Sequence, residues 1–260
     1  GMGAISNILN ILREVSLGGF YFKIAFLLRQ TIFLSTILLN SEAWVNLTQK
    51  NIEELEKIDQ ILLKRIFESP VSTPIKLLYL ESGSYPLRFH IKIRRVMYLH
   101  YLLNRDDEEL ISRVSWAQIR DPTKNDWYST VKNDLIELGL NYLDLQDIKI
   151  FKKDAFKKLV KQKCDDLVLK YLLDGNETMS KVKNLKYYEL EMQPYLLSSK
   201  ISTQRKKYLF LFRSRMINVG HNYGRKSPCP LCKMENDTQQ HMFNCIIMKL
   251  ACRELFTSTE

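Results

Sequence analysis

The sequence predicts an all-α fold of one or more multi-helix bundles, followed by a small C-terminal module rich in cysteine. Apolar residues recur every three or four positions along most of the 260 residues, which is the period of an amphipathic helix. No segment shows the alternation of apolar and polar residues that is typical of strands. Near the C-terminus, cysteine and histidine follow the pattern C-x2-C-x8-H-x3-C, which is typical of a small metal-binding module.

The first strong helical pattern runs from Thr48 to Phe67. Its apolar residues lie three or four positions apart, with glutamate and lysine between them: Ile52, Leu55, Ile58, Leu62 and Ile66. Pro70 and Pro74 are expected to end this helix, because proline cannot continue the hydrogen bonding of a helix. A turn around 81–86 then leads into a helix predicted over Leu87–Leu103.

Asp106 and Asp107 are expected to cap a helix that reaches Arg120 and is stopped by Pro122. Further helices are predicted over Asn125–Leu138, Leu145–Leu173, Glu177–Met192 and Thr203–Asn218, separated by Gly139, Gly175 and Pro194. This order predicts three regions: a helical region at 1–120, a helical linker at 121–220, and the metal-binding module with a C-terminal helix at 221–260.

The most apolar run, Ile24 to Leu39, raises the question of a membrane helix. It contains 16 residues and is interrupted by Arg29 and Gln30, whereas a bilayer requires about 20 apolar residues. The run is therefore predicted to be a core helix, and no membrane partner is expected.

Composition sets outer bounds on the fold and its partners. A hydrophobic content of 45% in 260 residues excludes a disordered chain and allows one large or two modest domains. Lysine and arginine number 39 against 29 acidic residues, a net charge of +10. This excess indicates either a polyanionic partner or a solvated basic surface, and charge alone does not decide between them.

The cysteine-rich module has the ligands of a structural zinc site. Cys229 and Cys232 flank a tight turn, and His241 and Cys245 lie four residues apart on a helix expected to open at a capping box in 237–240. Three thiolates and one imidazole fill a tetrahedron and leave no position for water, so the predicted role of Zn2+ is structural. The site would carry a charge of about −1. Nearby cations that could offset it are Arg225, Lys226, Lys233, Lys249 and Arg253.

Other uses of these cysteines, and other ligands, fit the sequence less well. A disulfide between the first two cysteines is disfavoured, because no signal peptide precedes them and five cysteines cannot all pair. Cys252 is seven residues beyond Cys245, about 10 Å along a helix, and is expected to be a buried thiol. His221 competes as a ligand only if its loop folds back towards the module.

Basic residues cluster on three of the predicted helices and could track phosphates. The candidate contacts are Arg88, Lys92, Arg94, Arg95, Lys153, Lys157, Lys158, Lys161, Arg205, Lys206, Lys207, Arg213, Arg215, Arg225 and Lys226. The third cluster also contains the aromatic residues Tyr208, Phe210 and Phe212, which could stack on bases. Burial of these aromatics against neighbouring helices is the favoured interpretation. Lysine stripes are also often only the solvated side of a helix.

Acidic pairs do not indicate catalysis. Asp106–Asp107 and Asp165–Asp166 lie on predicted helices, whereas a two-metal polymerase centre needs carboxylates that converge on ions about 4 Å apart. No phosphate-binding loop, dinucleotide turn or serine triad is present in the sequence. The chain is therefore expected to be non-catalytic.

Several short segments, taken in order, resemble the C-terminal region of reverse transcriptases of non-LTR (LINE-like) retroelements. They are 27–32 with 37–44, 52–59 with 62–63, 79–83, 94–99, 126–127, and the terminal Cys229, Cys232, His241 and Cys245. The resemblance implies a thumb, a helical linker and a zinc knuckle. It also implies that the catalytic palm would lie upstream and that no downstream endonuclease follows. Lys233 and Met234 stand where such knuckles commonly carry a glycine.

The resemblance implies a protein that binds RNA, DNA or both, alongside an upstream polymerase module or another protein. It fits either a fragment of such an element or a domesticated descendant with a new partner. Free thiols predict an intracellular, reducing compartment, and the resemblance implies the nucleus. The alternative hypothesis is a helical protein-interaction scaffold in which zinc serves folding only.

Overall fold

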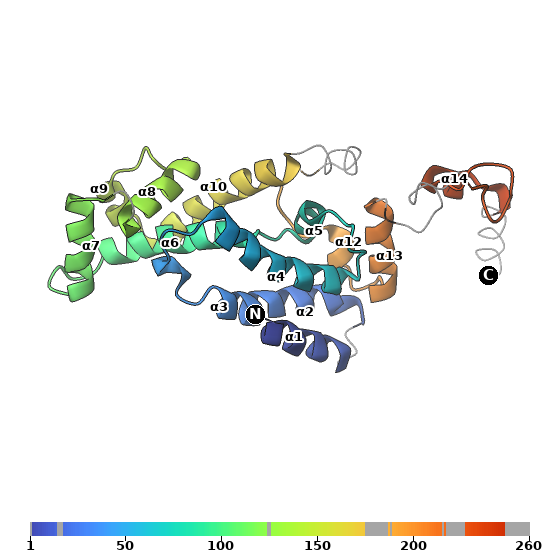
Figure 1. The fold of residues 1–260 in the computed structure, drawn as a ribbon, viewed down its shortest axis with the longest axis horizontal. Helices are drawn as coiled ribbons and strands as arrows, with labels where there is room; N and C mark the ends of the chain where they lie inside the picture. The colour runs from blue at the N-terminus through green and yellow to red at the C-terminus, as the bar shows by residue number, and fades with distance from the viewer. Residues whose placement is uncertain are drawn as a thin grey trace.

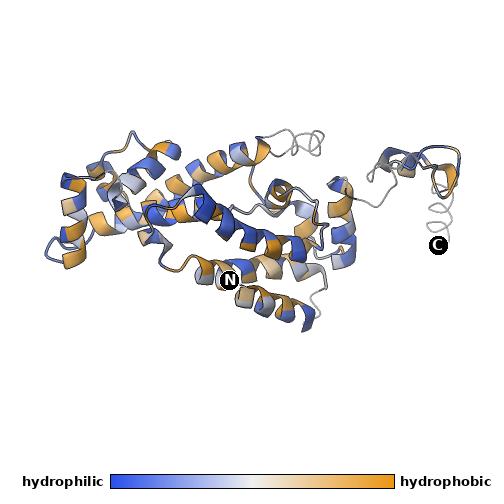
Figure 2. Cartoon of the chain, viewed as in Figure 1, coloured by the Kyte–Doolittle hydropathy of each residue, from blue (hydrophilic) through white to orange (hydrophobic). Residues whose placement is uncertain are grey.

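The structure, a computed structural model, describes residues 2–14, 18–123, 126–174, 187, 189–214, 216 and 227–247. Within these ranges the chain is helical, without strands, and the only β pairing is an isolated antiparallel bridge between Pro228 and Asn236. The helices form an elongated body, and residues 227–247 lie at one end of the view in Figure 1. Most helices carry orange and blue residues side by side in Figure 2, as expected for helices buried on one face. The predicted all-α class is confirmed.

The N-terminal helices are α1 (Met2–Glu14), η1 (Gly18–Phe20), α2 (Tyr21–Leu28), the π-helical turn η2 (Arg29–Phe33), α3 (Leu34–Ile37) and η3 (Ser41–Ala43). By length and composition alone, Gly18–Ile37 is a helix that could cross a membrane, and 33% of its most apolar window is buried inside the protein. A helix packed in a protein core meets the same criteria. Phe22 and Phe33 are fully buried, and Arg29 forms an ion pair inside the protein. These contacts agree with the predicted core helix.

The central helices are α4 (Gln49–Phe67), α5 (Ile75–Ser82), α6 (Leu87–Leu103) and α7 (Leu110–Arg120). The side chains of Thr48 and Asn51 form a capping box at the start of α4. The helix ends at Glu68, whose φ of 49° is left-handed, before either predicted proline stop is reached. Helix α6 occupies the bounds predicted for it and packs against α4, α7, α8, α9 and α10.

The remaining helices are α8 (Trp127–Glu137), α9 (Leu145–Ile150), α10 (Lys153–Leu173), α12 (Pro194–Leu197), α13 (Thr203–Arg213) and α14 (Gln239–Asn244). The single helix predicted over Leu145–Leu173 is wrong, because Phe151 and Lys152 are extended and separate α9 from α10. The predicted cap of α7 is also wrong. Its N-cap is Glu109, and Asp106 instead accepts a hydrogen bond from the backbone of Glu108. Most of the helix predicted over Glu177–Met192 lies outside the described residues.

One buried apolar cluster extends from Ile5 to Phe210. The ring of Phe67, at the end of α4, lies 5.1 Å from that of Phe22 and 4.5 Å from that of Phe210. Val131 and Phe156 belong to the same cluster. Residues on both sides of the boundary predicted between 120 and 121 thus contribute to one buried cluster.

Glu81 on α5 joins segments that lie more than 100 residues apart. Its carboxylate is fully buried and accepts hydrogen bonds from the hydroxyls of Tyr187 and Tyr195, and Arg213 forms an ion pair with it. Gly83 follows with a φ of 61°, and a Cβ there would lie 2.4 Å from the backbone of Glu191. The turn after α5 thus needs glycine both for its conformation and for this close approach.

Candidate metal centre and basic surfaces

Cys229, Cys232, His241 and Cys245 converge on one point. Their candidate ligand atoms all lie within 4.8 Å of one another. The sulfurs of Cys229 and Cys245 are 4.0 Å apart, and the sulfur of Cys232 is 3.2 Å from Nε2 of His241. Tetrahedral bonds of about 2.3 Å to sulfur would separate two thiolates by about 3.7 Å. The four residues can therefore hold a metal ion, with little movement of the chain.

Local hydrogen bonds shape the loop that carries the first two cysteines. The N–H of Lys233 donates to the carbonyl of Cys229 at 2.9 Å, and the N–H of Cys229 donates to the carbonyl of Glu235 at 2.7 Å. The bridge between Pro228 and Asn236 closes this small hairpin. Lys233 has a φ of 58°, the left-handed conformation that favours glycine.

The other two ligands are held by α14. Thr238 is the N-cap and accepts a hydrogen bond from the backbone of His241 at 2.9 Å. The helix ends at Asn244, so Cys245 is its C-cap rather than a residue of the helix as predicted. Its N–H still donates to the carbonyl of His241 at 2.6 Å. This bond keeps the imidazole and the thiol on the same side.

Hydrogen bonds also tune the ligands. Nδ1 of His241 lies 2.8 Å from Oε2 of Glu235, which leaves Nε2 directed at the sulfurs. The backbone N–H of Met234 is the main cause that lowers the pKa of Cys232 to about 6, so this thiol ionises readily at neutral pH. Burial opposes protonation of His241, but hydrogen bonds to Cys232 and Glu235 outweigh it and raise its pKa. Metal binding must then displace a proton.

Several residues named from the sequence lie outside the described residues. They are His221, Cys252, Arg215, Arg225, Lys226, Lys249 and Arg253. Lys233 is described and exposed in the hairpin. Of the five cations expected to offset the charge of the metal site, Lys233 is the one within the described residues.

The basic cluster on α6 faces the protein's own carboxylates. Arg95 is buried and its Nε lies 2.6 Å from Asp134, and Lys92 pairs with Asp134 and Glu137 at 3.2 and 2.9 Å. Arg88 pairs with Glu56 at 2.7 Å. These three cations are therefore paired within the protein, and their contact with phosphate stays a prediction.

Arg94 and its neighbour His90, on the same helix, differ from these three residues. Arg94 donates to the carbonyl of Leu38 at 2.6 Å, forms a longer ion pair with Glu42 at 3.9 Å, and keeps 37% of its side chain exposed. Burial, followed by the charges of Arg29 and Arg94, lowers the pKa of His90 to about 3, so His90 is neutral at physiological pH. Of the candidate contacts on α6, Arg94 is the most exposed.

The cluster on α13 is also largely internal. Lys206 is fully buried and donates to the carbonyls of Gly19 and Leu196, Lys207 pairs with Glu68, and Arg213 pairs with Glu81. Arg205 remains exposed. Among the aromatics, Phe210 is fully buried as the core interpretation predicts, whereas Tyr208 is 59% exposed.

The lysines of α10 form the largest group of predicted cations that the structure leaves exposed. Lys153, Lys157, Lys158 and Lys161 are all exposed, and their ammonium groups form no hydrogen bond or ion pair with another described residue. The opposite side of α10 is buried through Phe156, Val160, Cys164, Val168 and Leu172. Of the acidic pair on this helix, Asp165 accepts a hydrogen bond from the hydroxyl of Tyr85.

A second group of cations was missed at the sequence level. Arg13 on α1 and Lys57, Lys64 and Arg65 on α4 line one groove. They form no dense run in the sequence, because they belong to two helices that pack side by side. The available signal was the seven-residue interval between Lys57 and Lys64 on α4, which places both on one face of the helix.

Comparisons with protein-family models, curated proteins and solved structures gave no match.

Proposed function

We propose that this protein binds nucleic acid through the lysine face of α10 and that its Cys3His cluster holds a structural zinc ion. The observation that carries the proposal is the row of exposed α10 lysines without acidic partners. A cation already paired with a carboxylate must break that pair to bind phosphate, whereas an unpaired lysine needs only to release its own hydration and counterions.

The spacing of the row suits a phosphate backbone. Lys153, Lys157 and Lys161 recur every four residues, which is about 6 Å per step along a helix. The row therefore extends about 12 Å, against a phosphate every 3.4 Å per strand along a duplex. Three or four phosphate contacts would position the nucleic acid without reading its bases.

Zinc is the metal that the ligand chemistry favours. Thiolate and imidazole ligands in a tetrahedral set are typical of Zn2+, and four protein ligands leave no site for a reacting water. The ion would then fix the hairpin to α14 rather than take part in a reaction. The resemblance to the thumb, linker and knuckle of non-LTR reverse transcriptases supports a nuclear, non-catalytic nucleic-acid-binding region that works beside a polymerase module.

Neutralising the α10 row should weaken binding and flatten its salt dependence. We expect the variant K153A/K157A/K158A/K161A to bind an RNA/DNA hybrid duplex at least tenfold more weakly near 0.1 M salt. Each lost phosphate contact should reduce the slope of log affinity against log salt by about 0.9, or by about three in all. Filter-binding titrations at several salt concentrations measure both quantities, and titrations with single-stranded RNA and duplex DNA show which is preferred.

The matched control removes the same charge from scattered positions. Lys23, Lys50, Lys132 and Lys200 are exposed on other parts of the body, so K23A/K50A/K132A/K200A changes the net charge equally. If this control lost as much affinity and slope as the α10 variant, binding would depend on overall charge and the assignment to α10 would be wrong.

The conformation of Lys233 gives a prediction for the metal centre. A left-handed residue with a Cβ costs about 1–2 kcal/mol relative to glycine, and metal binding and folding are coupled in such modules. We expect K233G to raise the apparent affinity for Zn2+ about fivefold in a competition titration with a chelator. K233A keeps the Cβ and should give no gain, and an equal gain from both substitutions would contradict the explanation by backbone strain.

The groove between α1 and α4 favours a second candidate function, the protein-interaction scaffold. Its lining combines aliphatic and cationic side chains. That combination suits a partner with both apolar and acidic side chains.

A further inference from the structure

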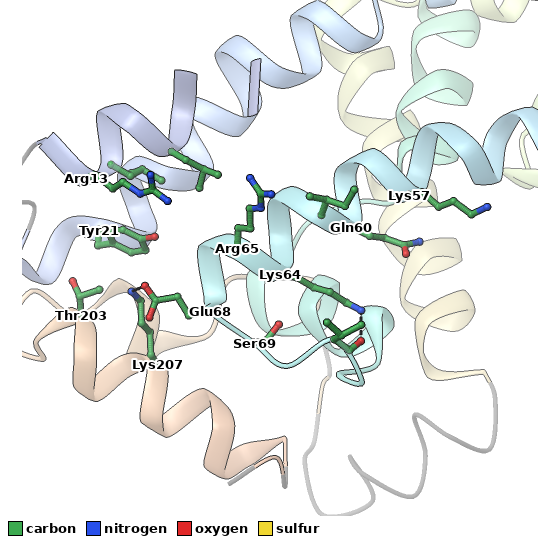
Figure 3. Close-up of a pocket in the computed structure, with 14 residues that line it drawn as sticks. Arg13, Tyr21, Lys57, Gln60, Lys64, Arg65, Glu68, Ser69, Thr203 and Lys207 are labelled. Carbon is green, nitrogen blue, oxygen red and sulfur yellow. Dashed lines mark hydrogen bonds and ion pairs between the residues drawn. The ribbon is translucent and has the colours of Figure 1, made fainter. Parts of the chain in front are cut away.

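A groove of about 960 Å3 lies between α1, α4, the turn after α4 and the start of α13. Figure 3 shows Arg13 and Arg65 on opposite walls of this space, with Lys57 and Lys64 farther along α4. None of these four cations is among the residues expected from the sequence to contact nucleic acid. The groove is separate from both the metal centre and the lysine row of α10.

The floor and lip of the groove are aliphatic. Leu9 and Leu12 from α1 are mostly buried at its base. Ile61 on α4 is 37% exposed and Val71 in the following turn is 88% exposed. Apolar surface left open between two helices favours a ligand that brings apolar groups of its own.

The rim is strongly cationic. Arg13, Lys57 and Arg65 are exposed, and none has an ion pair or a side-chain hydrogen bond with another described residue. Nζ of Lys64 donates to the carbonyl of Val71 at 2.5 Å, which leaves its charge without a carboxylate. The one carboxylate of the lining, Glu68, is paired with Lys207. The groove therefore presents four uncompensated positive charges around aliphatic surface.

The wall formed by α4 has the length and spacing of a helix-binding surface. Its lining positions run from Lys57 to Glu68 along one face, which corresponds to about 16 Å or three helical turns. Helix-binding grooves accept apolar side chains at positions i, i+3, i+4 and i+7 of an amphipathic partner. Carboxylates beside those anchors would meet the cationic rim.

We infer that this groove binds an acidic amphipathic helix of a partner protein. Nucleic acid fits it less well, because single strands bind through stacking on aromatic faces as well as through charge. Tyr21 is the only aromatic side chain in the lining, and Nζ of Lys207 already lies 4.7 Å from the centre of its ring. An aliphatic floor offers no stacking surface, whereas leucine-like side chains pack on it well.

The test uses two synthetic 18-residue peptides of identical composition. One places leucine at i, i+3, i+4 and i+7 with glutamate between, and the other has the same residues scrambled so that no apolar face forms. In fluorescence-anisotropy titrations with the full chain, the amphipathic peptide should bind at least tenfold more tightly than the scrambled one. Equal binding would overturn the inference, because net charge alone would then explain it.

Substitutions assign the binding to the groove. R65E and I61D change side chains that are exposed or partly exposed, and each should weaken the amphipathic peptide at least tenfold. R113E reverses an exposed arginine on α7 and should leave binding unchanged. If R65E and I61D bound the peptide as tightly as the unchanged protein, the proposal would be wrong. It would also be wrong if these variants kept the peptide but lost binding to anionic vesicles or duplex DNA.

This inference is independent of the proposed nucleic-acid function. K153A/K157A/K158A/K161A should bind the amphipathic peptide as well as the unchanged protein does, and R65E should keep its affinity for the hybrid duplex within about twofold. Each proposal can thus fail while the other stands.

Discussion

Replacement of Cys245 by serine is expected to unfold residues 227–247 while the helical body stays folded. Among the described side chains of this module, the buried ones are Cys229, His241 and Cys245, all of them candidate ligands. The described side chains of the module thus form almost no apolar core, and the proposed metal coordination would take its place. Structural zinc contributes about 10–16 kcal/mol to such modules at neutral pH, far more than a few backbone hydrogen bonds supply.

Native mass spectrometry and limited proteolysis measure this effect together. We expect the unchanged protein to carry one Zn2+ and C245S to carry none, with rapid trypsin cleavage after Lys233 only in C245S. Addition of a strong chelator to the unchanged protein should reproduce the cleavage. Far-UV circular dichroism should change little, because the helices of the body remain.

Cys252 provides the matched control. It lies outside the described residues, and its distance along the chain excludes it from the predicted ligand set. C252S should therefore keep one Zn2+ and remain resistant to trypsin. Loss of the metal in C252S, or its retention in C245S, would show that the ligand set is wrong.

The metal centre was predictable from the sequence because all its ligands lie within 17 residues. Their approach depends on a short hairpin and one turn of helix, and local spacing determines both. The sequence could not show that Cys245 is a C-cap or that Glu235 orients the imidazole. It did single out Lys233 as an unusual residue for its position, and the positive φ there supplies the physical reason.

The basic surfaces were much less predictable. Arg95 pairs with Asp134, 39 residues away, and Arg213 pairs with Glu81, 132 residues away. Nothing near these cations in the sequence indicates a carboxylate partner. In a sequence, a row of cations that binds phosphate therefore cannot be told from a row that pairs with the protein's own carboxylates. Only α10 combined its lysines with a clear buried face on the opposite side.

The break between α9 and α10 has a tertiary cause. No proline or glycine occurs between Asp144 and Leu173, so propensity favours one long helix. The carbonyl of Phe151 instead lies 2.9 Å from Nε2 of His100, and the Phe151 ring packs 5.8 Å from that of Phe156. These contacts with α6 and α10 hold the chain extended at the break.

The second large effect is expected at Asp59, in the interior of the helical body. Its carboxylate is fully buried and accepts two hydrogen bonds from Arg29, at 2.8 and 2.6 Å, and one from the hydroxyl of Tyr79 at 2.9 Å. Burial, and then the charge of Asp59, raises the pKa of Tyr79 well above its usual value, so Tyr79 remains a neutral donor. The cluster joins α4 and α5 to the π-helical turn that carries Arg29.

We expect D59N to lower the free energy of unfolding by about 3–5 kcal/mol. The amide keeps the shape of the carboxylate but leaves the guanidinium of Arg29, only 4% exposed, as a buried charge without a counterion. Urea denaturation followed by far-UV circular dichroism measures the change. D166N removes an exposed carboxylate and should change the same free energy by less than about 0.5 kcal/mol.

A double substitution separates the cost of an orphaned charge from the value of the pair itself. Replacing a buried ion pair by apolar residues is often neutral or stabilising, whereas removing one partner is strongly destabilising. R29M/D59L should therefore be more stable than D59N, although Tyr79 loses its acceptor in the double variant and can keep an amide oxygen as acceptor in D59N. If D59N cost less than about 1 kcal/mol, water would have to reach Arg29. If R29M/D59L were the less stable of the two variants, the pair itself would be a net source of stability.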